Sequence, residues 1–273
     1  MIDLHCHVLP GVDDGSRSIE DSMEMLKKAA ASGVEIVVVF FFKQKTAYEI
    51  DLIEQKQLIA DLQKTAGENG IDIQIKPGYE CYLSPDIFED AGKLSELTIN
   101  NNGRYILVEL PMQSIPSGVE TIFTNLEGRG ITPIIAHPER NMVVCRNPNV
   151  LFDIVSKGCI AQLNAGSILG HFGKASKRIA EILLTHNLVH VVASDMHSAR
   201  APSLDRAVPA IRELIGSENA SRLFIDNPRK ILAGEAIHKE PPKRYEPARR
   251  SLADILFRRK KPSHAVKCGS FAQ

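Results

Sequence analysis

Short apolar runs alternate with amphipathic segments over most of this chain. The apolar runs are continuous and rich in Val, Ile and Leu, as expected for strands covered on both faces. They lie at residues 2–5, 34–39, 71–77, 105–109, 132–136, 159–163 and 189–193. Apolar positions with helical spacing predict helices over about 19–32, 51–68, 118–128, 148–157, 174–186 and 204–233. Strands that alternate with helices in this way predict a parallel sheet or barrel.

Polar residues able to bind a metal ion stand at the end of every apolar run except the second, which ends in three phenylalanines. These residues are His5, His7, Glu80, Glu109, His137, Asn164, Asp195 and His197. In a barrel of parallel strands the chemistry collects at the carboxyl ends of the strands, so these side chains are expected to form one site. Imidazoles and carboxylates without thiolates suit divalent ions such as manganese, iron or zinc. The pattern predicts a multinuclear metal hydrolase.

Two of the candidate ligand pairs have the same spacing. His5 and His7 are two residues apart on the first strand, so both imidazoles face one side, and Asp195 and His197 repeat this on the last strand. First and last strands are neighbours in a closed barrel. The alternative is that the carboxylates are loop residues and His137 is a core histidine. Seven convergent ligands exceed what one ion needs, so two or three ions are expected.

Other polar residues near these ligands admit two interpretations. Arg140 and Arg200 each follow a candidate histidine by three residues, and they either bind phosphate oxygens or form structural ion pairs. Asp13 and Asp14 either orient the histidines or are turn residues. The glycine-rich stretch 166–173 lacks the Lys-Ser/Thr of a phosphate loop, and we expect a lid or a helix-entry loop there.

Charge divides the 273-residue chain at the Glu-Pro-Pro of residues 240–242. From residue 239 onward ten Lys/Arg face three Asp/Glu, although the net charge of the whole chain is zero. We therefore expect one barrel domain over 1–238 and a basic, disordered tail over 239–273. Docking of the tail on anionic lipid or nucleic acid is the alternative, and we expect no nucleic-acid partner.

The chain carries few signs of export or membrane insertion. No apolar run approaches the roughly 20 residues that span a bilayer. A strand and a ligand pair occupy the first seven residues, where a signal peptide would have to lie. The five cysteines are odd in number, scattered, and not in a CxxC pair. These features predict reduced thiols in a cytoplasmic protein.

Several motifs together resemble the polymerase-and-histidinol-phosphatase (PHP) superfamily. They are MIDLHCHVLPGVDDG, PGYE, VELP, IIAHPERN, LNAGSILGHFG and VVASDMH, and the resemblance extends over about residues 1–236. Within the superfamily the chain is similar to the bacterial manganese-dependent protein-tyrosine phosphatases encoded with capsule and exopolysaccharide genes. The resemblance implies a distorted (β/α)7 barrel with a three-metal site.

The same resemblance implies an activity and roles for residues. The expected reaction is hydrolysis of phosphotyrosine by metal-activated water, on the tyrosine-rich tail of a membrane tyrosine kinase that controls polysaccharide export. The expected cofactor is Mn2+, as two or three divalent ions, with iron or zinc as alternatives. By position, Arg140 and Arg200 are implied as phosphate contacts. The implied metal ligands are His5, His7, Glu80, Glu109, His137, Asp195 and His197.

The second strand departs from the family pattern. Where the family has Ala-Thr-Pro-His-His, this chain has Val-Phe-Phe-Phe-Lys at residues 39–43, and Phe42 cannot bind a metal. Residues 43–50 resemble the translation of a sequencing-adapter oligonucleotide, which suggests that about 40–50 replace a natural Thr-Pro-His-His loop. If the segment is genuine, one metal position is damaged. Phe40 to Phe42 are expected to be exposed, or packed irregularly beside the polar site.

Three functions are therefore compared. The first is the metal-dependent tyrosine phosphatase, favoured by open loops around the site. The second is a phosphatase of a small molecule such as histidinol phosphate, favoured by a walled pocket. The third is an impaired regulator that binds phosphotyrosine without hydrolysing it, because Phe42 replaces a histidine. A cysteine-dependent phosphatase is not expected, since Cys145 and Arg146 are adjacent and lack the Cys-x5-Arg spacing.

Overall fold

Seven parallel strands form the centre of the molecule. The computed structural model describes residues 1–43, 52–84, 88 and 94–247, but not the side chains of residues 42, 43, 52 and 53. The strands pair in sequence order, each parallel to the next. They are β1 (Ile2–Cys6), β2 (Ile36–Lys43), β3 (Gln74–Tyr82), β4 (Tyr105–Glu109), β5 (Thr132–Ala136), β6 (Ile160–Asn164) and β7 (Val191–Ala193).

The sheet closes between its first and last strands. Cys6 and Met196 form a parallel bridge. The amide of Asp195 donates to the carbonyl of His5 at 2.8 Å, and the amide of His7 donates to the carbonyl of Met196 at 2.9 Å. The predicted (β/α)7 barrel is therefore confirmed, and so is the expectation that the first and last strands are neighbours.

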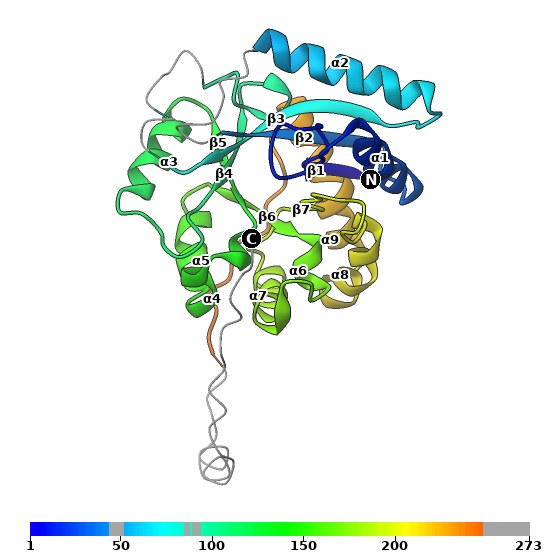
Figure 1. Ribbon diagram of the computed structural model, residues 1–273. Helices are drawn as coiled ribbons and strands as arrows, with labels where there is room; N and C mark the ends of the chain where they lie inside the picture. Colours follow the sequence, from blue (N-terminus) through cyan, green and yellow to red (C-terminus); the bar gives the residue numbers. More distant parts are fainter. Residues whose placement is uncertain (44–51, 85–87, 89–93, 248–273) are drawn as a thin grey trace.

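Helices surround the strands (Figure 1). Ser18 caps α1, accepting from the Asp21 amide at 3.3 Å, so the helix begins where a side-chain acceptor satisfies its first turn. The α-helices are α1 (Ile19–Ala31), α2 (Leu52–Glu68), α3 (Val119–Gly128), α4 (Met142–Arg146), α5 (Asn149–Val155), α6 (Ala165–Ile168), α7 (Gly173–Thr185), α8 (Val208–Ile215), α9 (Ser217–Ser221) and α10 (Asn227–Ala233). The shorter turns are η2 (Ile99–Asn101), η3 (Pro138–Arg140), η4 (Leu204–Ala207) and the π-helical η5 (Arg222–Asp226).

Two apolar clusters result from the alternation of side chains along the strands. The smaller one includes Leu4, Val38, Leu107 and Ile134 and fills the barrel. The larger one joins the outer faces of the strands to the helices. Both faces of the sheet are thus buried, which explains why the strands are continuously apolar rather than alternating.

The second and third strands end later than the apolar runs predict. The third run was expected to end at residue 77, but β3 continues to Tyr82 and contains Glu80. Gly78, which suggests a turn in the sequence, is needed inside the barrel instead. A Cβ atom there would lie 2.7 Å from Cγ1 of Val38 and 2.9 Å from Cζ of Phe40. The glycine therefore makes room for the side chains of β2.

Exposure, one of the two outcomes expected for the phenylalanine cluster, is wrong for Phe40 and Phe41, whereas Phe40 does lie beside the polar site. Phe40 is completely buried inside the barrel, with its ring centroid 4.8 Å from that of His5. Phe41 is buried on the opposite face, 5.6 Å from the ring of Tyr79. The alternation of β2 gives each ring an apolar environment. The side chain of Phe42 and residues 44–51 lie outside the described part, so the suspected replacement remains a hypothesis.

The chain beyond α10 contacts the barrel domain as far as Tyr245. The Tyr105 hydroxyl donates to the carbonyl of Glu235 at 2.7 Å, and the Lys243 amide donates to the carbonyl of His186 at 2.8 Å. Arg244 pairs with Asp153 at 2.6 Å. Residues 239–247, assigned to the tail from composition, thus contact the domain. The boundary at 238 stays a prediction, and 248–273 lie outside the described residues.

Within the part of the chain that the structure describes, none of the helices is both long and apolar enough to cross a membrane.

Candidate active site

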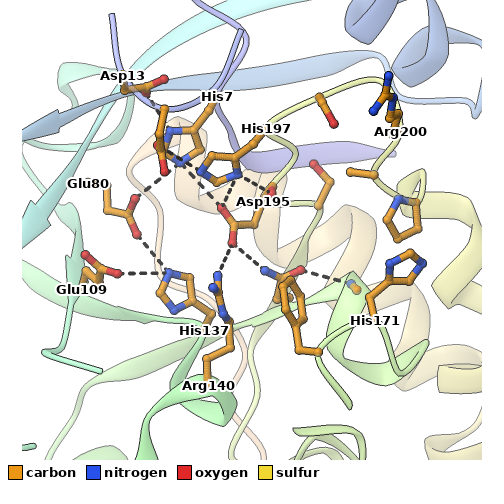
Figure 2. Close-up of a pocket in the computed structure, with 18 of the residues that line it drawn as sticks. His7, Asp13, Glu80, Glu109, His137, Arg140, His171, Asp195, His197 and Arg200 are labelled. Atoms are coloured by element: carbon orange, nitrogen blue, oxygen red, sulfur yellow. Dashed lines mark hydrogen bonds and ion pairs between the residues drawn. The ribbon is translucent and has the colours of Figure 1, made fainter. Parts of the chain in front are cut away.

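The carboxyl ends of the strands surround a pocket of about 1010 Å³. Figure 2 shows imidazoles and carboxylates from different strands pointing toward one another in this pocket. Six of the seven residues predicted as metal ligands line this pocket, and the seventh, His5, lies buried directly behind His7. Each lies within hydrogen-bond or ion-pair distance of another member of the set.

His5 and His7 direct the same kind of atom at one point. Nδ1 of His5 lies 3.0 Å from Oε1 of Gln162, and Nδ1 of His7 lies 2.7 Å from Oδ2 of Asp13. Both partners are acceptors, so each Nδ1 carries a proton, and a neutral imidazole then has its lone pair on Nε2. The two Nε2 atoms are only 3.0 Å apart. Two lone pairs this close repel unless a proton or a metal ion lies between them.

Two buried carboxylates face the same nitrogens. Oε2 of Glu80 lies 3.3 Å from Nε2 of His5 and 3.5 Å from Nε2 of His7. Oδ1 of Asp195 lies 3.5 Å and 3.6 Å from the same two atoms. Two imidazole nitrogens and two carboxylate oxygens from buried side chains thus converge. This donor set fits a hard or borderline divalent ion.

Further ligand groups adjoin this one. The ligand atoms of Glu80, Glu109 and His137 lie within 4.8 Å of one another, and so do those of His7, Asp195 and His197. The rings of His7 and His197 stack with centroids 4.1 Å apart. Because Glu80, His7 and Asp195 belong to more than one group, the groups lie side by side. The donor set therefore fits more than one ion.

Two of these residues have unusual backbone conformations. His137, directly after β5, has a φ of +29°, and Asp195, two residues after β7, has a φ of +51°. Residues other than glycine adopt such angles at a cost of the order of 1–3 kcal/mol. The strain turns both side chains toward the pocket.

The buried carboxylates of the cluster need neighbouring positive charge to remain ionised. Burial pushes the pKa of Glu80 upward, but the neighbouring charge of His5 and hydrogen bonds from His137, His5 and His7 hold it well below its usual range. For His137, burial acts in the opposite direction and lowers the pKa. The hydrogen bond to Glu80 and the carboxylate charges outweigh burial and raise the pKa of His137 to about 9. Either imidazolium protons or metal ions must balance these carboxylates, and ion binding would release the protons.

Asp13 and Asp14 combine the two roles considered from the sequence. Oδ1 of Asp13 accepts from the Gly15 amide at 2.8 Å, as in an Asx turn, while its Oδ2 orients His7. Oδ1 of Asp14 lies 3.3 Å from Nε2 of His197. The hydrogen bond from His197 lowers the pKa of Asp14 to about 2.

Asn164, which was expected at the site, and Glu139 and Gln162, which were not, hold the ligands from behind. Asn164 Nδ2 donates to Oδ2 of Asp195 at 2.6 Å. The fully buried Glu139 accepts from the Asn164 amide at 3.0 Å and from the Ser167 hydroxyl at 2.6 Å. Gln162 orients His5 from inside β6. The only sequence signal for Gln162 is a polar residue in an apolar strand, and Glu139 gives none beyond its place beside His137.

The two arginines lie at different depths. Arg140 NH1 donates to Oδ2 of Asp195 at 3.1 Å, and its guanidinium lies over the ring of Phe172 at 4.4 Å. Arg200 is exposed at the rim of the pocket and lines it without touching a predicted ligand. Both could reach an anion bound in the pocket, as proposed from the sequence. Their roles stay a prediction.

The glycine-rich stretch builds one wall of the pocket. It enters α7 through Gly170 and Gly173, which have φ angles of +85° and +87°, and it brings His171 and Phe172 to the pocket. A Cβ on Gly166 would lie 2.9 Å from Cε2 of Phe172, so the glycine lets this ring sit close. Of the two roles expected for this segment, a lid and a helix-entry loop, the structure shows the helix-entry loop.

A family model for capsular polysaccharide synthesis proteins of the CpsB/CapC type matches residues 1–233. The chain belongs to the CpsB/CapC family. Its relatives include the tyrosine-protein phosphatase YwqE of Bacillus subtilis, 32% identical over 244 residues, which are 89% of this chain and 95% of YwqE. The tyrosine-protein phosphatase CpsB of Streptococcus pneumoniae is 33% identical over 244 residues, covering 87% of this chain and all of CpsB.

Solved structures agree with this assignment. One described as YwqE from Bacillus subtilis and CpsB from Streptococcus pneumoniae, metal-dependent tyrosine phosphatases, matches with a TM-score of 0.86 at 32% identity, covering 90% of this chain and 100% of the other. Histidinol phosphate phosphatase from Lactococcus lactis, complexed with zinc, matches with a TM-score of 0.55 at 13% identity, covering 82% and 94%. At that identity it supports the fold alone. The resemblance to the bacterial metal-dependent tyrosine phosphatases, which the motifs predicted, is therefore confirmed.

Proposed function

We propose that this protein is a metal-dependent protein-tyrosine phosphatase. The observation that carries the proposal is the convergence of His5, His7, Glu80 and Asp195, whose imidazole nitrogens and carboxylate oxygens lie 3.0 to 3.5 Å apart. Arg140 lies next to this cluster, where a guanidinium can bind phosphoryl oxygens. The YwqE and CpsB relatives carry the name of tyrosine-protein phosphatases, which supports the same activity.

The ions are proposed to be two or three Mn2+, with iron or zinc as alternatives. They would be held by the seven predicted ligands, His5, His7, Glu80, Glu109, His137, Asp195 and His197. When bound, such ions lower the pKa of water and polarise phosphoryl oxygens.

The chain's own residues bind and orient the substrate. Arg140 presents its guanidinium to the phosphoryl group, and its stacking on Phe172 fixes the plane of its donors. Asn164 and Arg140 both donate to Oδ2 of Asp195, which leaves Oδ1 to face the imidazoles. The exposed part of the pocket, about 1010 Å³ in all, leaves room for a phenol ring and adjoining peptide. A wide pocket favours a protein substrate over a small molecule.

Thiolate chemistry has no support among the four cysteines in the described part of the chain. Cys6, Cys81 and Cys159 are buried. Burial raises the pKa of the Cys6 thiol well above its usual range and that of Cys159 to about 12. Cys145 directs its sulfur at the carbonyl of Glu139, 3.1 Å away. These thiols are therefore protonated or turned away from an attacking position.

The substrate is proposed to be a phosphotyrosine protein, namely the tail of a membrane tyrosine kinase that controls polysaccharide export. Membership of the capsular polysaccharide synthesis family supports this choice. Because such a tail would lie in the cytoplasm, we place the enzyme there as well.

The decisive experiment compares substrates and inhibitors on the purified chain. Hydrolysis of a phosphotyrosine peptide in the presence of Mn2+ is expected, with abolition by chelator and little effect of thiol alkylation. Faster turnover of histidinol phosphate would favour the small-molecule phosphatase. Binding of the peptide without turnover would favour the impaired regulator, whereas inactivation by alkylation alone would overturn the metal-dependent reaction.

A further inference from the structure

A second depression adjoins the active-site pocket beyond Arg200. It encloses about 400 Å³, and we call it the annex. Its lining residues are Lys28, Leu169, His171, Arg200, Pro202, Ser203 and Arg206. His171, Arg200 and Pro202 line both the annex and the active-site pocket, so the two are continuous. Figure 2 shows His171 and Arg200 together on the side of the active-site pocket away from Glu80 and Glu109.

The charged side chains that line the annex are all cationic. They are Lys28, Arg200 and Arg206, and no carboxylate lines the annex. Among the ion pairs formed within the described part of the chain, none involves Arg200 or Arg206. Their charge is therefore not neutralised by the protein itself. A cleft lined by one sign of charge concentrates ligands of the opposite sign.

Part of this charge is held in place by the fold. Lys28, on α1, donates from Nζ to the carbonyl of Ala199 at 2.8 Å and to that of Ala201 at 2.5 Å. These two carbonyls flank Arg200, so the lysine ties the loop after β7 to α1. Lys28 is only partly exposed. Hydrogen bonds of the fold therefore fix one cation of the annex beside the active site, so the annex is not a chance set of mobile surface side chains.

The proposed reaction does not need these groups. A phosphoryl group at the metal ligands already meets Arg140, and no residue of the annex except Arg200 was implicated in binding it. A peptide substrate, in contrast, continues beyond its phosphotyrosine. Its neighbouring side chains would lie over the rim, where His171 and Arg200 lead into the annex.

We propose that the annex binds a second anionic side chain of the same peptide substrate, either a carboxylate or a second phosphoryl group. This inference rests on the proposed phosphatase function. Both ligands offer paired oxygens that match the fork of an arginine. Because Arg200 and Arg206 are exposed, the expected preference is modest, about three- to tenfold in kcat/KM and mainly through KM.

The test uses full-length protein with Mn2+ and three peptides that contain one target phosphotyrosine. The first peptide has neutral neighbours, the second has glutamates, and the third has a second phosphotyrosine. Arg206→Gln removes one charge from the annex, and Arg212→Gln is the matched control, since Arg212 is exposed on α8 and does not line the annex. Free phosphotyrosine, which has no neighbouring side chains to enter the annex, serves as the reference substrate.

The wild-type chain should prefer the anionic peptides, and the preference should weaken with salt. Arg206→Gln should lose most of the preference while it hydrolyses the neutral peptide and free phosphotyrosine at the wild-type rate, and Arg212→Gln should behave as wild type. A stronger gain with glutamate or with phosphotyrosine identifies the ligand. Equal rates for all three peptides, or an equal effect of both substitutions, would contradict anion binding by the annex. Either result would leave the proposed phosphatase function unaffected.

A binding measurement separates the two proposals. Fluorescence anisotropy of the same labelled peptides, recorded in chelator, reports the annex without turnover. If no peptide were hydrolysed but the anionic ones bound more tightly through Arg206, the phosphatase function would fail and the annex would stand. If neither hydrolysis nor anion-dependent binding occurred, both would fail.

Discussion

Asp195 connects the arginine at the site to the imidazoles. Its Oδ2 accepts from Asn164 at 2.6 Å and from Arg140 at 3.1 Å, and its Oδ1 faces His5 and His7. Since Asn164 alone still orients the carboxylate, Arg140→Ala should leave the bound metal unchanged. It should lower kcat by about a hundredfold, or about 3 kcal/mol of transition-state stabilisation. Steady-state kinetics and elemental metal analysis check both expectations.

Arg200→Ala should lower kcat/KM by a smaller factor, because Arg200 is exposed at the rim. Arg129→Ala, at an exposed position on the far end of α3, is the control and should have no effect. Loss of metal in step with activity would mean that Arg140 supports the ligands rather than the substrate.

His190 is buried behind the site and should make stability depend on pH. Its Nδ1 accepts from the Ala161 amide at 3.2 Å, and burial followed by the charge of Lys239 lowers its pKa to about 3. The unfolded chain, with a pKa near 6.5, binds the proton between these values. Stability is therefore retained above about pH 6.5 and lost as pH falls, by about 2 kcal/mol at pH 5.

His190→Asn keeps an acceptor for the Ala161 amide but cannot titrate. Urea unfolding at pH 7.5 and pH 5 should show a loss of stability that is about 2 kcal/mol smaller in this variant than in the wild type. An identical pH dependence in the two proteins would contradict the assignment.

At the scale of residues, the sequence was informative wherever a polar group follows an apolar strand. His5, His137 and Asp195 are recognisable because strand ends of a barrel meet, whatever the loops do. Gln162 and Glu139 were not recognisable, because their roles come from contacts between strands distant in sequence. Only the register and closure of the barrel create those contacts.

At the scale of elements, β2 and β3 depend on each other. Gly78→Ala would place a Cβ 2.7 Å from Val38 and 2.9 Å from Phe40, both inside the barrel. Overpacking of this kind costs about 1–3 kcal/mol. Gly67→Ala, within α2 and with open space around it, is the control and should be neutral or slightly stabilising. Chemical denaturation of both variants tests whether the glycine is required by packing.

The backbone register of β2 suggests where a further metal ligand can be added. Phe42 pairs with Glu80, the residue shared by two ligand groups. Phe42→His should raise bound metal by up to one ion per chain and increase phosphatase rate. Phe40 should be left in place, because it fills the barrel interior. Phe42→Leu removes the ring without adding a ligand, so it should change neither quantity.

Metal analysis and kinetics on both variants test this prediction, and resequencing of the source gene shows whether residues 40–50 are genuine.

The ends of β2 and β3 could not be predicted from the apolar runs. Pro77 and Gly78 indicate a turn locally, whereas the packing of Val38 and Phe40 keeps the strand continuous.

At the scale of the whole molecule, the alternation of strands and helices was enough to predict the barrel, because each parallel strand needs a crossover and both faces need cover. The end of the domain was harder to predict. Composition changes at residues 240–242, but the following residues are polar ones that hydrogen-bond to the barrel. Contacts made by polar chains leave no periodic signal, so composition alone cannot place the boundary.

The contacts of residues 239–247 predict where the chain can be shortened. The Tyr245 amide donates to Oδ1 of Asn149 at 2.8 Å, Asn149 returns a bond to the carbonyl of Tyr245 at 3.0 Å, and Arg244 lies over the ring of Phe152 at 4.7 Å. A chain ending at 247 should match the full-length protein in melting temperature and phosphatase rate. One ending at 238 should lose about 1–3 kcal/mol of stability, since these bonds and ion pairs are partly exposed and individually weak.

Both truncations keep every proposed metal ligand, so metal content should not change. Equal melting temperatures for the two would place the boundary at 238, as the composition indicates.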